Sequence, residues 1–394
     1  MTPFPASLIQ GMSLVLGSLL LGACIVPTAT AQSPQPAPEA APQKAPPSES
    51  IIISPEVSAT RMVTFRIQAP DARSVTLKGL RHHLPDEPMV KDSSGLWSVT
   101  VGPLAPDFYS YQLVIDSATV TDPSNREIRK YFTNESMLEV PGTPPMLASV
   151  QAVPHGVIHH QTYASKVRNA DAGVWIYTPP GYDPRASTLY PVVYLLHGYG
   201  DSEESWINVG RANSIVDNLI AQHRIRPMIV VMPDGHPIRV HTREAVKGYY
   251  ASNTPALQSD LLGQVIPLIE GDYRADPSPE KRAIVGLSMG GGQALSIGLG
   301  NLGIFKWVGA FSSAVPEGDP GTTFAGLVKD KSLRPDLLWL GTGKSDVSHV
   351  AQNEALHLWL QQNGIVHTWV LSDGAHDWTV WRAYLPQFLE LVFQ

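Results

Sequence analysis

A serine between glycines is the residue of this chain best suited to act as a nucleophile. Gly286-Leu287-Ser288-Met289-Gly290 follows an apolar run, 283–285, and leads into the small residues of 290–295. A strand, a sharp turn and a helix in this order are typical of a nucleophile elbow, in which glycines two positions from the serine permit a strained turn. The motif by itself is weak, because it also occurs by chance in glycine-rich chains.

An acid and a histidine follow Ser288 in the order Ser, Asp, His that an α/β-hydrolase requires, each after a predicted strand. Asp346 lies in the loop after one strand and is the candidate acid. His376 lies in a glycine-containing loop after the next strand and is the candidate base. Asp373 and Asp377 flank His376 too closely to reach across and orient its ring, so we interpret them as loop or helix-cap carboxylates.

A strand that opens into a glycine loop supplies a candidate oxyanion hole. Val192–Leu196 runs into His197-Gly198-Tyr199-Gly200, where the backbone N–H of Tyr199 could pair with that of Met289 on a developing oxyanion. The alternative interpretation is a plain strand-to-helix turn with His197 hydrogen-bonded in the core. Four such features in the right order predict serine hydrolase chemistry through an acyl-enzyme, which requires no cofactor and no metal.

Composition and charge limit the partners. The chain has 394 residues, 43% of them hydrophobic, and a net charge of −7. No run of lysines or arginines stands out, which argues against nucleic acid as a partner. We therefore expect a neutral ester, either a small molecule or one linked to polysaccharide, and the oligomeric state stays open. His82-His83 and His159-His160 lack further ligands at metal spacing and give little support for a zinc site.

The first 31 residues have the features of a leader for export. Leu14–Val26 is mostly apolar and Ala29-Thr30-Ala31 resembles a cleavage site, which predicts a signal peptide over residues 1–31. Leu21-Gly22-Ala23-Cys24 also resembles a lipobox, in which Cys24, the only cysteine of the chain, would carry a lipid anchor. Both interpretations stay open, and both predict an exported bacterial protein that is periplasmic, secreted or anchored to the envelope.

The remaining chain divides by composition into a linker and two folded modules. Residues 32–50 are rich in Pro, Ala and Ser, which predicts a flexible linker. Residues 51–142 contain short alternating runs between turns, typical of a small all-β sandwich. Residues 143–394 alternate apolar strands with helices, which predicts an α/β fold with a doubly wound sheet. Its predicted strands are 192–196, 228–232, 283–285, 307–311, 337–340 and 367–371, and its predicted helices are 260–273, 294–302, 353–362 and 380–393.

Short motifs spread over the catalytic region carry a family resemblance. They are Pro154-His155-Gly156, Tyr177-Thr178-Pro179-Pro180-Gly181-Tyr182-Asp183, Leu196-His197-Gly198, Pro233-Asp234-Gly235-His236, the serine motif with Gly291, and His376-Asp377-Trp378 with Trp381-Arg382. On these residues the chain resembles the esterase D-like α/β-hydrolases, in particular the feruloyl and acetyl-xylan esterases of carbohydrate esterase family 1. It departs from that family where Ala375 replaces a frequent glycine and where the path to Asp346 is longer. The resemblance implies removal of feruloyl or acetyl groups from plant polysaccharide.

The sandwich module has a resemblance of its own. It rests on Pro88-Met89-Val90-Lys91-Asp92, Gly95-Leu96-Trp97, Leu104-Ala105-Pro106, Tyr109-Ser110-Tyr111 and Asp122-Pro123-Ser124-Asn125. On these residues the module is similar to the early-set, immunoglobulin-like domains related to glycogen-binding modules. Trp97, Tyr109 and Tyr111 alternate with polar neighbours, which favours positions in the sandwich core over a sugar-binding platform.

The shape of the pocket would select the acyl group and the alcohol of the substrate. Trp378 and Trp381 follow His376 and are predicted to line or support the acyl pocket, although packing in the core explains them nearly as well. The loops 237–250 and 316–334 are further segments whose residues would determine the shape of the pocket.

Other functions stay open beside the leading prediction of a secreted serine carboxylic-ester hydrolase. Enterochelin esterases share the two-module arrangement and cleave a cyclic catecholate ester. Related mycolyl-transferring enzymes share the fold and the mechanism, so an acyltransferase would carry the same residues. A non-catalytic glycan-binding surface protein is the alternative from another class, and the intact Ser288, Asp346 and His376 argue against it.

Overall fold

The structure of the protein is a computed structural model that describes residues 51–79, 86–239, 248–331 and 334–394. Residues 51–394 form one compact unit. The predictions for the leader 1–31, for Cys24, for the linker 32–50 and for His82-His83 concern residues outside the described ranges.

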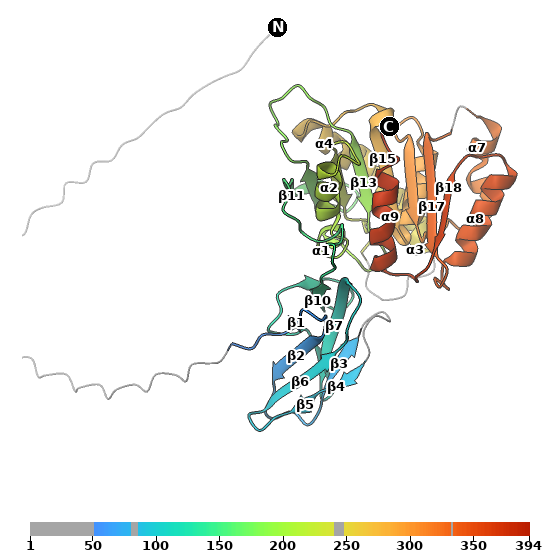
Figure 1. The fold of residues 1–394 in the computed structure, drawn as a ribbon. Coiled ribbons are helices and arrows are strands. Elements are labelled where there is room, and N and C mark those ends of the chain that lie inside the picture. The colour runs from blue at the N-terminus through green and yellow to red at the C-terminus, as the bar shows by residue number, and fades with distance from the viewer. Residues whose placement is uncertain (1–50, 80–85, 240–247, 332–333) are drawn as a thin grey trace, which may run out of the picture. The chain divides into compact units, whose positions relative to one another are not determined.

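One mixed sheet forms the centre of the catalytic region (Figure 1). Its eight strands lie in the order β11-β12-β14-β13-β15-β16-β17-β18, in which β11, β12 and β14 pair antiparallel and all later neighbours pair parallel. The bounds are β11 Val157–Ser165, β12 Ala170–Thr178, β13 Val192–Leu196, β14 Ile229–Pro233, β15 Arg282–Leu287, β16 Trp307–Phe311, β17 Leu337–Gly343 and β18 Thr368–Ser372. All residues of β13, β14 and β15 are buried, as expected for strands covered on both faces.

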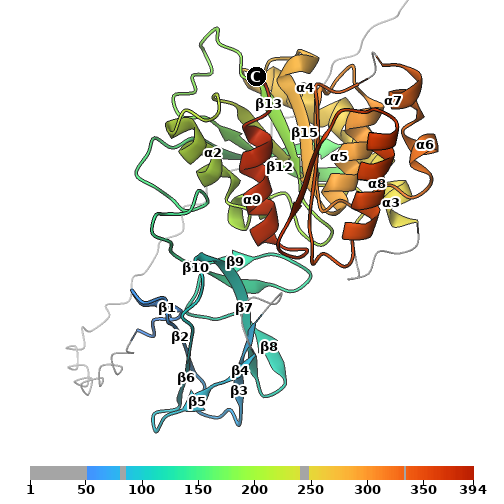
Figure 2. The ribbon, with the colours of Figure 1, turned by 45° about the vertical axis from the view of Figure 1, so that its right-hand side comes forward.

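Helices cover both faces of this sheet (Figure 2). One apolar cluster joins the sheet to α1, α2 and α9, and a second joins its other face to α3, α4, α5 and α8. The bounds are α1 Ser205–Asn208, α2 Ala212–Ala221, α3 Tyr249–Asp260, α4 Ile266–Asp272, α5 Met289–Gly300, α6 Pro320–Thr323, α7 Ala325–Lys329, α8 Val350–Gln362 and α9 Trp378–Leu389, with a π-helical segment, Leu261–Val265, between α3 and α4 and a 3-10 turn at Pro279–Lys281. Among the described residues, no helix combines the length and the apolar character that crossing a membrane would need.

The predicted strands are confirmed, whereas two predicted helices begin too late. Helical structure starts at Tyr249 rather than at residue 260, because α3 contains Pro255 and few apolar residues and so lacks the usual helical pattern. α5 starts at Met289 rather than at residue 294, because its first turn consists largely of glycines, which are poor helix formers. Packing explains those glycines: a Cβ on Gly292 would lie 2.0 Å from the Ala314 carbonyl oxygen.

The all-β module contains two antiparallel sheets. Their strand orders are β1-β2-β6-β5 and β4-β3-β7-β10-β9, with β8 beside β7. The bounds are β1 Glu56–Val57, β2 Val63–Gln68, β3 Val75–Gly79, β4 Glu87–Pro88, β5 Val90–Lys91, β6 Leu96–Val101, β7 Asp107–Ile115, β8 Ala118–Val120, β9 Ile128–Arg129 and β10 Glu135–Val140. Trp97, Tyr109 and Tyr111 are buried between the sheets, which confirms their assignment to the core. The immunoglobulin-like identity of the module stays a prediction.

A partly buried ion pair joins this module to the last helix of the catalytic region. The Arg382 guanidinium of α9 lies 2.6 Å from the Asp107 carboxylate at the start of β7 and also donates to the Val209 carbonyl at 3.0 Å. Thr379 donates to the same carboxylate at 2.5 Å. Because α9 begins two residues after His376, the all-β module contacts an element that holds the candidate base.

Candidate active site

Ser288 lies on a strained turn between β15 and α5, as the elbow motif predicts. Its backbone has φ 52° and ψ −117°, in a region that residues with a Cβ rarely adopt. The turn depends on the two flanking glycines: a Cβ on Gly290 would lie 2.5 Å from the His197 carbonyl oxygen, and one on Gly286 would lie 2.5 Å from the Gly290 backbone. The surrounding backbone therefore requires glycine at both positions, and the serine hydroxyl stands at the N-terminus of α5.

The structure brings Ser288, His376 and Asp346 into one chain of hydrogen bonds. His376 Nε2 lies 2.9 Å from Ser288 Oγ, and its Nδ1 lies 2.8 Å from Asp346 Oδ2. Asp346 follows β17, and His376 lies in the loop between β18 and α9. Burial raises the pKa of the Asp346 carboxyl, but hydrogen bonds to His349 and His376 outweigh that effect and hold the pKa well below its ordinary value. The carboxylate is therefore ionised and can accept the Nδ1 proton of His376.

A second histidine, which the sequence analysis did not identify, shares this carboxylate. The His349 backbone N–H donates to Asp346 Oδ1 at 3.0 Å, and the His349 ring stacks on the His376 ring with centroids 4.2 Å apart and planes 12° apart. Asp346, His349 and His376 thus bring three potential metal-ligand atoms within 4.8 Å of one another. Because the rings are nearly parallel, their nitrogen lone pairs lie in separate planes and do not converge on one ion. We interpret the group as a hydrogen-bonded network that covers one face of His376.

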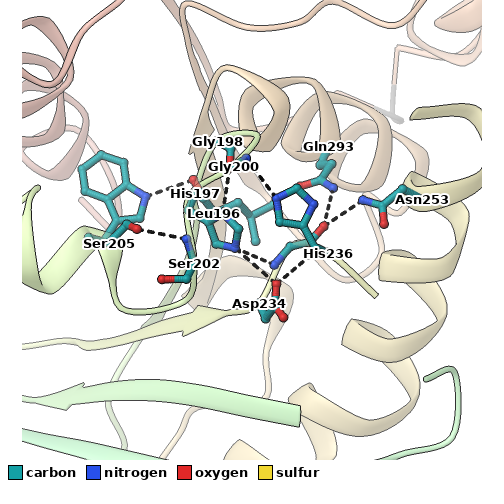
Figure 3. Close-up of polar contacts among 12 residues, drawn as sticks. Leu196, His197, Gly198, Gly200, Ser202, Ser205, Asp234, His236, Asn253 and Gln293 are labelled. Carbon is teal, nitrogen blue, oxygen red and sulfur yellow. Dashed lines mark hydrogen bonds and ion pairs between the residues drawn. The ribbon is translucent and has the colours of Figure 1, made fainter. Parts of the chain in front are cut away.

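The loop after β13, residues 197–204 and called the β13 loop below, lies against the serine. A Cβ on Gly198 would be 3.5 Å from the Ser288 Cβ. His197 holds the loop through two hydrogen bonds: its Nδ1–H donates to the Gly198 carbonyl at 2.9 Å, and its Nε2 accepts from the Gly235 N–H at 2.8 Å (Figure 3). Burial lowers the pKa of His197, but the Asp234 carboxylate, whose Oδ1 lies 3.5 Å from Nε2, outweighs that effect and raises the pKa. His197 is thus buried and hydrogen-bonded in the core, and the assignment of the oxyanion hole to Tyr199 and Met289 stays a prediction.

His236, which lies just after the end of β14, also holds the β13 loop. His236 Nε2 accepts from the Gly200 N–H at 3.3 Å (Figure 3). Its Nδ1–H donates to the Tyr249 hydroxyl at 2.5 Å. Burial lowers the pKa of His236 to about 3, so the ring stays neutral and keeps the lone pair that Gly200 needs. Both candidate oxyanion donors therefore belong to rigid elements: Tyr199 lies in this loop, and Met289 is the first residue of α5.

Asp234 binds the backbone of His236 beside the β13 loop, and its charge makes the stability of the fold depend on pH. Burial raises the pKa of its carboxyl, but the adjacent His197 ring, the Arg168 guanidinium at 2.9 Å and the His236 N–H together outweigh that effect and hold the pKa well below its ordinary value. As the pH falls, this carboxyl becomes protonated at about pH 4 in the unfolded chain and only at a lower pH in the folded chain. Asp234 therefore stabilises the fold above that pH, and the contribution is lost as the pH falls through the lower, folded pKa.

We expect Asp234→Asn to remove this acid-sensitive contribution. Urea unfolding at a series of pH values should show wild type more stable than the variant by a constant amount above about pH 5, with the difference shrinking below about pH 4. Asp183→Asn, at an exposed carboxylate paired with Arg185, provides the control and should leave the pH dependence unchanged. A difference that grows as the pH falls would contradict the assignment.

The two tryptophans predicted to serve the acyl pocket are buried. Trp378 is 4% and Trp381 2% exposed, and their rings contact each other with centroids 5.3 Å apart. The Trp381 ring meets the His376 ring edge-on at 5.0 Å, and Trp378 packs on Trp206. Both therefore lie in the core that supports His376, and a direct contact with substrate stays a prediction.

A group of aromatic rings surrounds Tyr199 instead. Its ring lies 5.5 Å from Phe132, 5.4 Å from Tyr249 and 6.3 Å from Tyr250 between centroids. Tyr249 and Tyr250 are the first two residues of α3, at the end of the segment 237–250 that was expected to shape the pocket, whereas Phe132 comes from the all-β module. No local motif marks Phe132, and its place became apparent only in the folded chain.

Comparison with known proteins identifies the family. The Esterase family model matches residues 165–391, a range that contains Ser288, Asp346 and His376. The chain belongs to this esterase family. It is 30% identical over 348 residues to an endo-1,4-beta-xylanase/feruloyl esterase of Xylanibacter ruminicola, a match that covers 86% of this chain and 46% of that protein. An esterase of Mycobacterium tuberculosis is 29% identical over 182 residues, which cover 43% of this chain and 35% of the relative. The esterase chain thus spans less than half the length of these curated relatives.

Solved structures confirm the fold class. A ferulic acid esterase of carbohydrate esterase family 1 from Anaeromyces mucronatus, solved with ferulic acid, has TM-score 0.56 and 26% identity over 62% of this chain and 93% of its own. The enterobactin esterase of Shigella flexneri has TM-score 0.61 and 18% identity, covers 84% of this chain and 92% of its own, and is similar in fold alone. The predicted α/β-hydrolase fold and the family resemblance are thereby confirmed, and the predicted class of carboxylic ester hydrolase agrees with membership of this family.

Proposed function

We propose that this esterase acts as a serine hydrolase in which Ser288 is the nucleophile, His376 the general base and acid, and Asp346 the residue that orients the imidazole. The observation that carries the proposal is the continuous set of hydrogen bonds, 2.9 Å from Ser288 Oγ to His376 Nε2 and 2.8 Å from His376 Nδ1 to Asp346 Oδ2. Nucleophile, base and orienting acid within hydrogen-bond reach are the arrangement that acyl transfer requires.

The proposed reaction has two halves. Ser288 Oγ attacks the ester carbonyl carbon while His376 Nε2 takes its proton, and the carbonyl oxygen becomes an oxyanion held by the N–H groups of Tyr199 and Met289. The C–O bond to the alcohol then breaks as His376 returns the proton to the leaving oxygen, which gives the acyl-enzyme. Water repeats the sequence and releases the acid. Asp346 stays ionised throughout and stabilises the imidazolium that forms twice.

We further propose that the acyl group is a feruloyl or acetyl group on plant polysaccharide. The similarity to a protein named endo-1,4-beta-xylanase/feruloyl esterase, which extends over 86% of the chain, supports this choice. The rings of Phe132, Tyr199 and Tyr250 beside the β13 loop offer apolar faces that suit a phenolic acyl group. Such a substrate lies outside the cytoplasm, in agreement with the export leader predicted for residues 1–31 and with the proposal of a periplasmic, secreted or lipid-anchored enzyme.

Turnover of three esters tests this function. Methyl ferulate, p-nitrophenyl acetate and a catecholate siderophore ester are incubated with the full chain, and Ser288→Ala controls for contaminating esterases. We expect methyl ferulate to be hydrolysed with the highest kcat/KM, because its phenolic acyl group suits the aromatic side chains near Tyr199. Acetate turnover alone would favour a deacetylase, siderophore turnover would favour the enterochelin-type alternative, and no turnover of any ester would contradict the proposal.

A further inference from the structure

The β9–β10 segment of the all-β module reaches the β13 loop through a buried ion pair. Arg129 Nη2 lies 2.7 Å from Asp201 Oδ1 in that loop, and Arg129 Nη1 lies 3.3 Å from Glu135 at the start of β10. The three side chains are 6% exposed or less. A buried guanidinium that binds two carboxylates fixes the orientation of those carboxylates as well as their distance, because its N–H donors lie in one plane and point in fixed directions.

An aromatic ring from the same segment packs on the next turn of the loop. A Cβ on Gly200 would lie 2.3 Å from Phe132 Cε2, so the ring rests directly on the Gly200 backbone. Gly200 has φ +83°, a conformation that favours glycine, and Phe132 also contacts the ring of Tyr199. Lys130 adds an exposed ion pair with Glu204 at 3.0 Å.

The residue between these contacts is the candidate oxyanion donor. Tyr199 has Gly198 on one side, which lies against Ser288, and Gly200 on the other, which is held between His236 and Phe132. The Asp201 N–H donates to the Gly198 carbonyl at 3.2 Å, so the carboxylate that Arg129 binds belongs to the residue that closes this turn. The direction of the Tyr199 N–H is therefore fixed by groups from both modules.

We propose that the all-β module positions the oxyanion hole through Arg129 and Phe132, a role that rests on the proposed serine hydrolase function. Neither residue touches the reacting atoms, and both are positioning residues. An oxyanion donor stabilises the transition state only when it points at the place where the charge develops. A displacement of about 1 Å can cost about 100-fold in rate, so loosening the β13 loop lowers kcat while the ground-state complex is little changed.

Two variants test the role, with p-nitrophenyl acetate as a substrate too small to depend on a glycan site. We expect Phe132→Ala and Arg129→Met each to lower kcat by about 10-fold to 100-fold with KM within about twofold of wild type. Phe132→Ala adds no unpaired charge, whereas Arg129→Met leaves Asp201 and Glu135 without their partner. Arg66→Met, which removes an exposed ion pair with Glu56 in the same module, is the matched control and should keep the wild-type kcat.

An inhibitor that forms an oxyanion separates positioning from loss of folded protein. Benzyl trifluoromethyl ketone accepts Ser288 Oγ at its carbonyl carbon, and its oxygen becomes an oxyanion as His376 takes the serine proton. We expect its inhibition constant to rise in Phe132→Ala by the same factor by which kcat/KM falls, because both quantities depend on how well the oxyanion hole stabilises the negative charge. Unchanged kcat and inhibition in folded Phe132→Ala would overturn the positioning role. Full activity in Ser288→Ala would instead overturn the proposed function, so the two failures are distinguishable.

Discussion

Replacing Ser288 by alanine should lower kcat for p-nitrophenyl acetate by about 10⁴-fold to 10⁶-fold, since the acyl-enzyme cannot form without the serine oxygen. The variant keeps His376 and Asp346 hydrogen-bonded at 2.8 Å, so a residual rate can come only from water held near the oxyanion hole. Steady-state kinetics with active-site titration of the wild type gives the ratio. Mass spectrometry of wild type quenched early in turnover should show the acyl group on the peptide that contains Ser288.

The fold should be unaffected by this change. Alanine keeps the Cβ, so the positive φ of 52° at residue 288 costs no more in the variant than in wild type. Ser165→Ala provides a matched control, because Ser165 is also a buried serine with a hydroxyl hydrogen bond, to Asp260 at 2.7 Å, and lies outside the site. That control should keep the wild-type kcat. A Ser288→Ala enzyme with more than about a tenth of wild-type turnover would assign the nucleophile elsewhere.

The arrangement of the candidate triad could be predicted because it depends on local order along the chain. Ser288, Asp346 and His376 each follow a strand, and the carboxyl ends of parallel strands meet at one edge of a sheet. Six of the eight strands are marked by continuous apolar runs and were predicted to within a few residues. The first two strands of the sheet, β11 and β12, were not predicted, because many of their residues are exposed or half-buried and they lack such runs. The sequence order of the motifs therefore carried most of the spatial information.

Residues that reach the site only when distant parts of the chain pack together could not be recognised from motifs in the sequence. His349 follows Asp346 by three positions in a loop, and only the folded chain shows its ring stacked on His376. Arg129 and Phe132 belong to a module predicted as a separate sandwich, and their contacts with the β13 loop depend on how two modules pack. Tertiary packing also determined where α3 begins, against the local preference of Pro255.

Asp346→Asn should lower kcat by about 10⁴-fold while the protein stays folded, the size of effect that loss of the orienting carboxylate has in serine proteases. Asp346 Oδ2 accepts from His376 Nδ1 and thereby leaves Nε2 free of a proton and directed at Ser288. An asparagine that presents its amide nitrogen to Nδ1 favours the opposite tautomer, in which Nε2 carries the proton and cannot act as a base. KM should change little, because the carboxylate does not contact the ester.

The matched control for this change is Asp373→Asn, which also removes a carboxylate next to the His376 loop. Asp373 is 97% exposed and pairs with Lys344 at 2.9 Å, so its loss should leave kcat within about twofold of wild type. Raising the pH should not rescue Asp346→Asn, because the defect is in the tautomer and in the missing charge rather than in a protonated imidazole. Wild-type turnover in Asp346→Asn together with a loss in Asp373→Asn would move the acid to the loop after β18, where the exposed carboxylate would have to displace Lys344 to reach the ring.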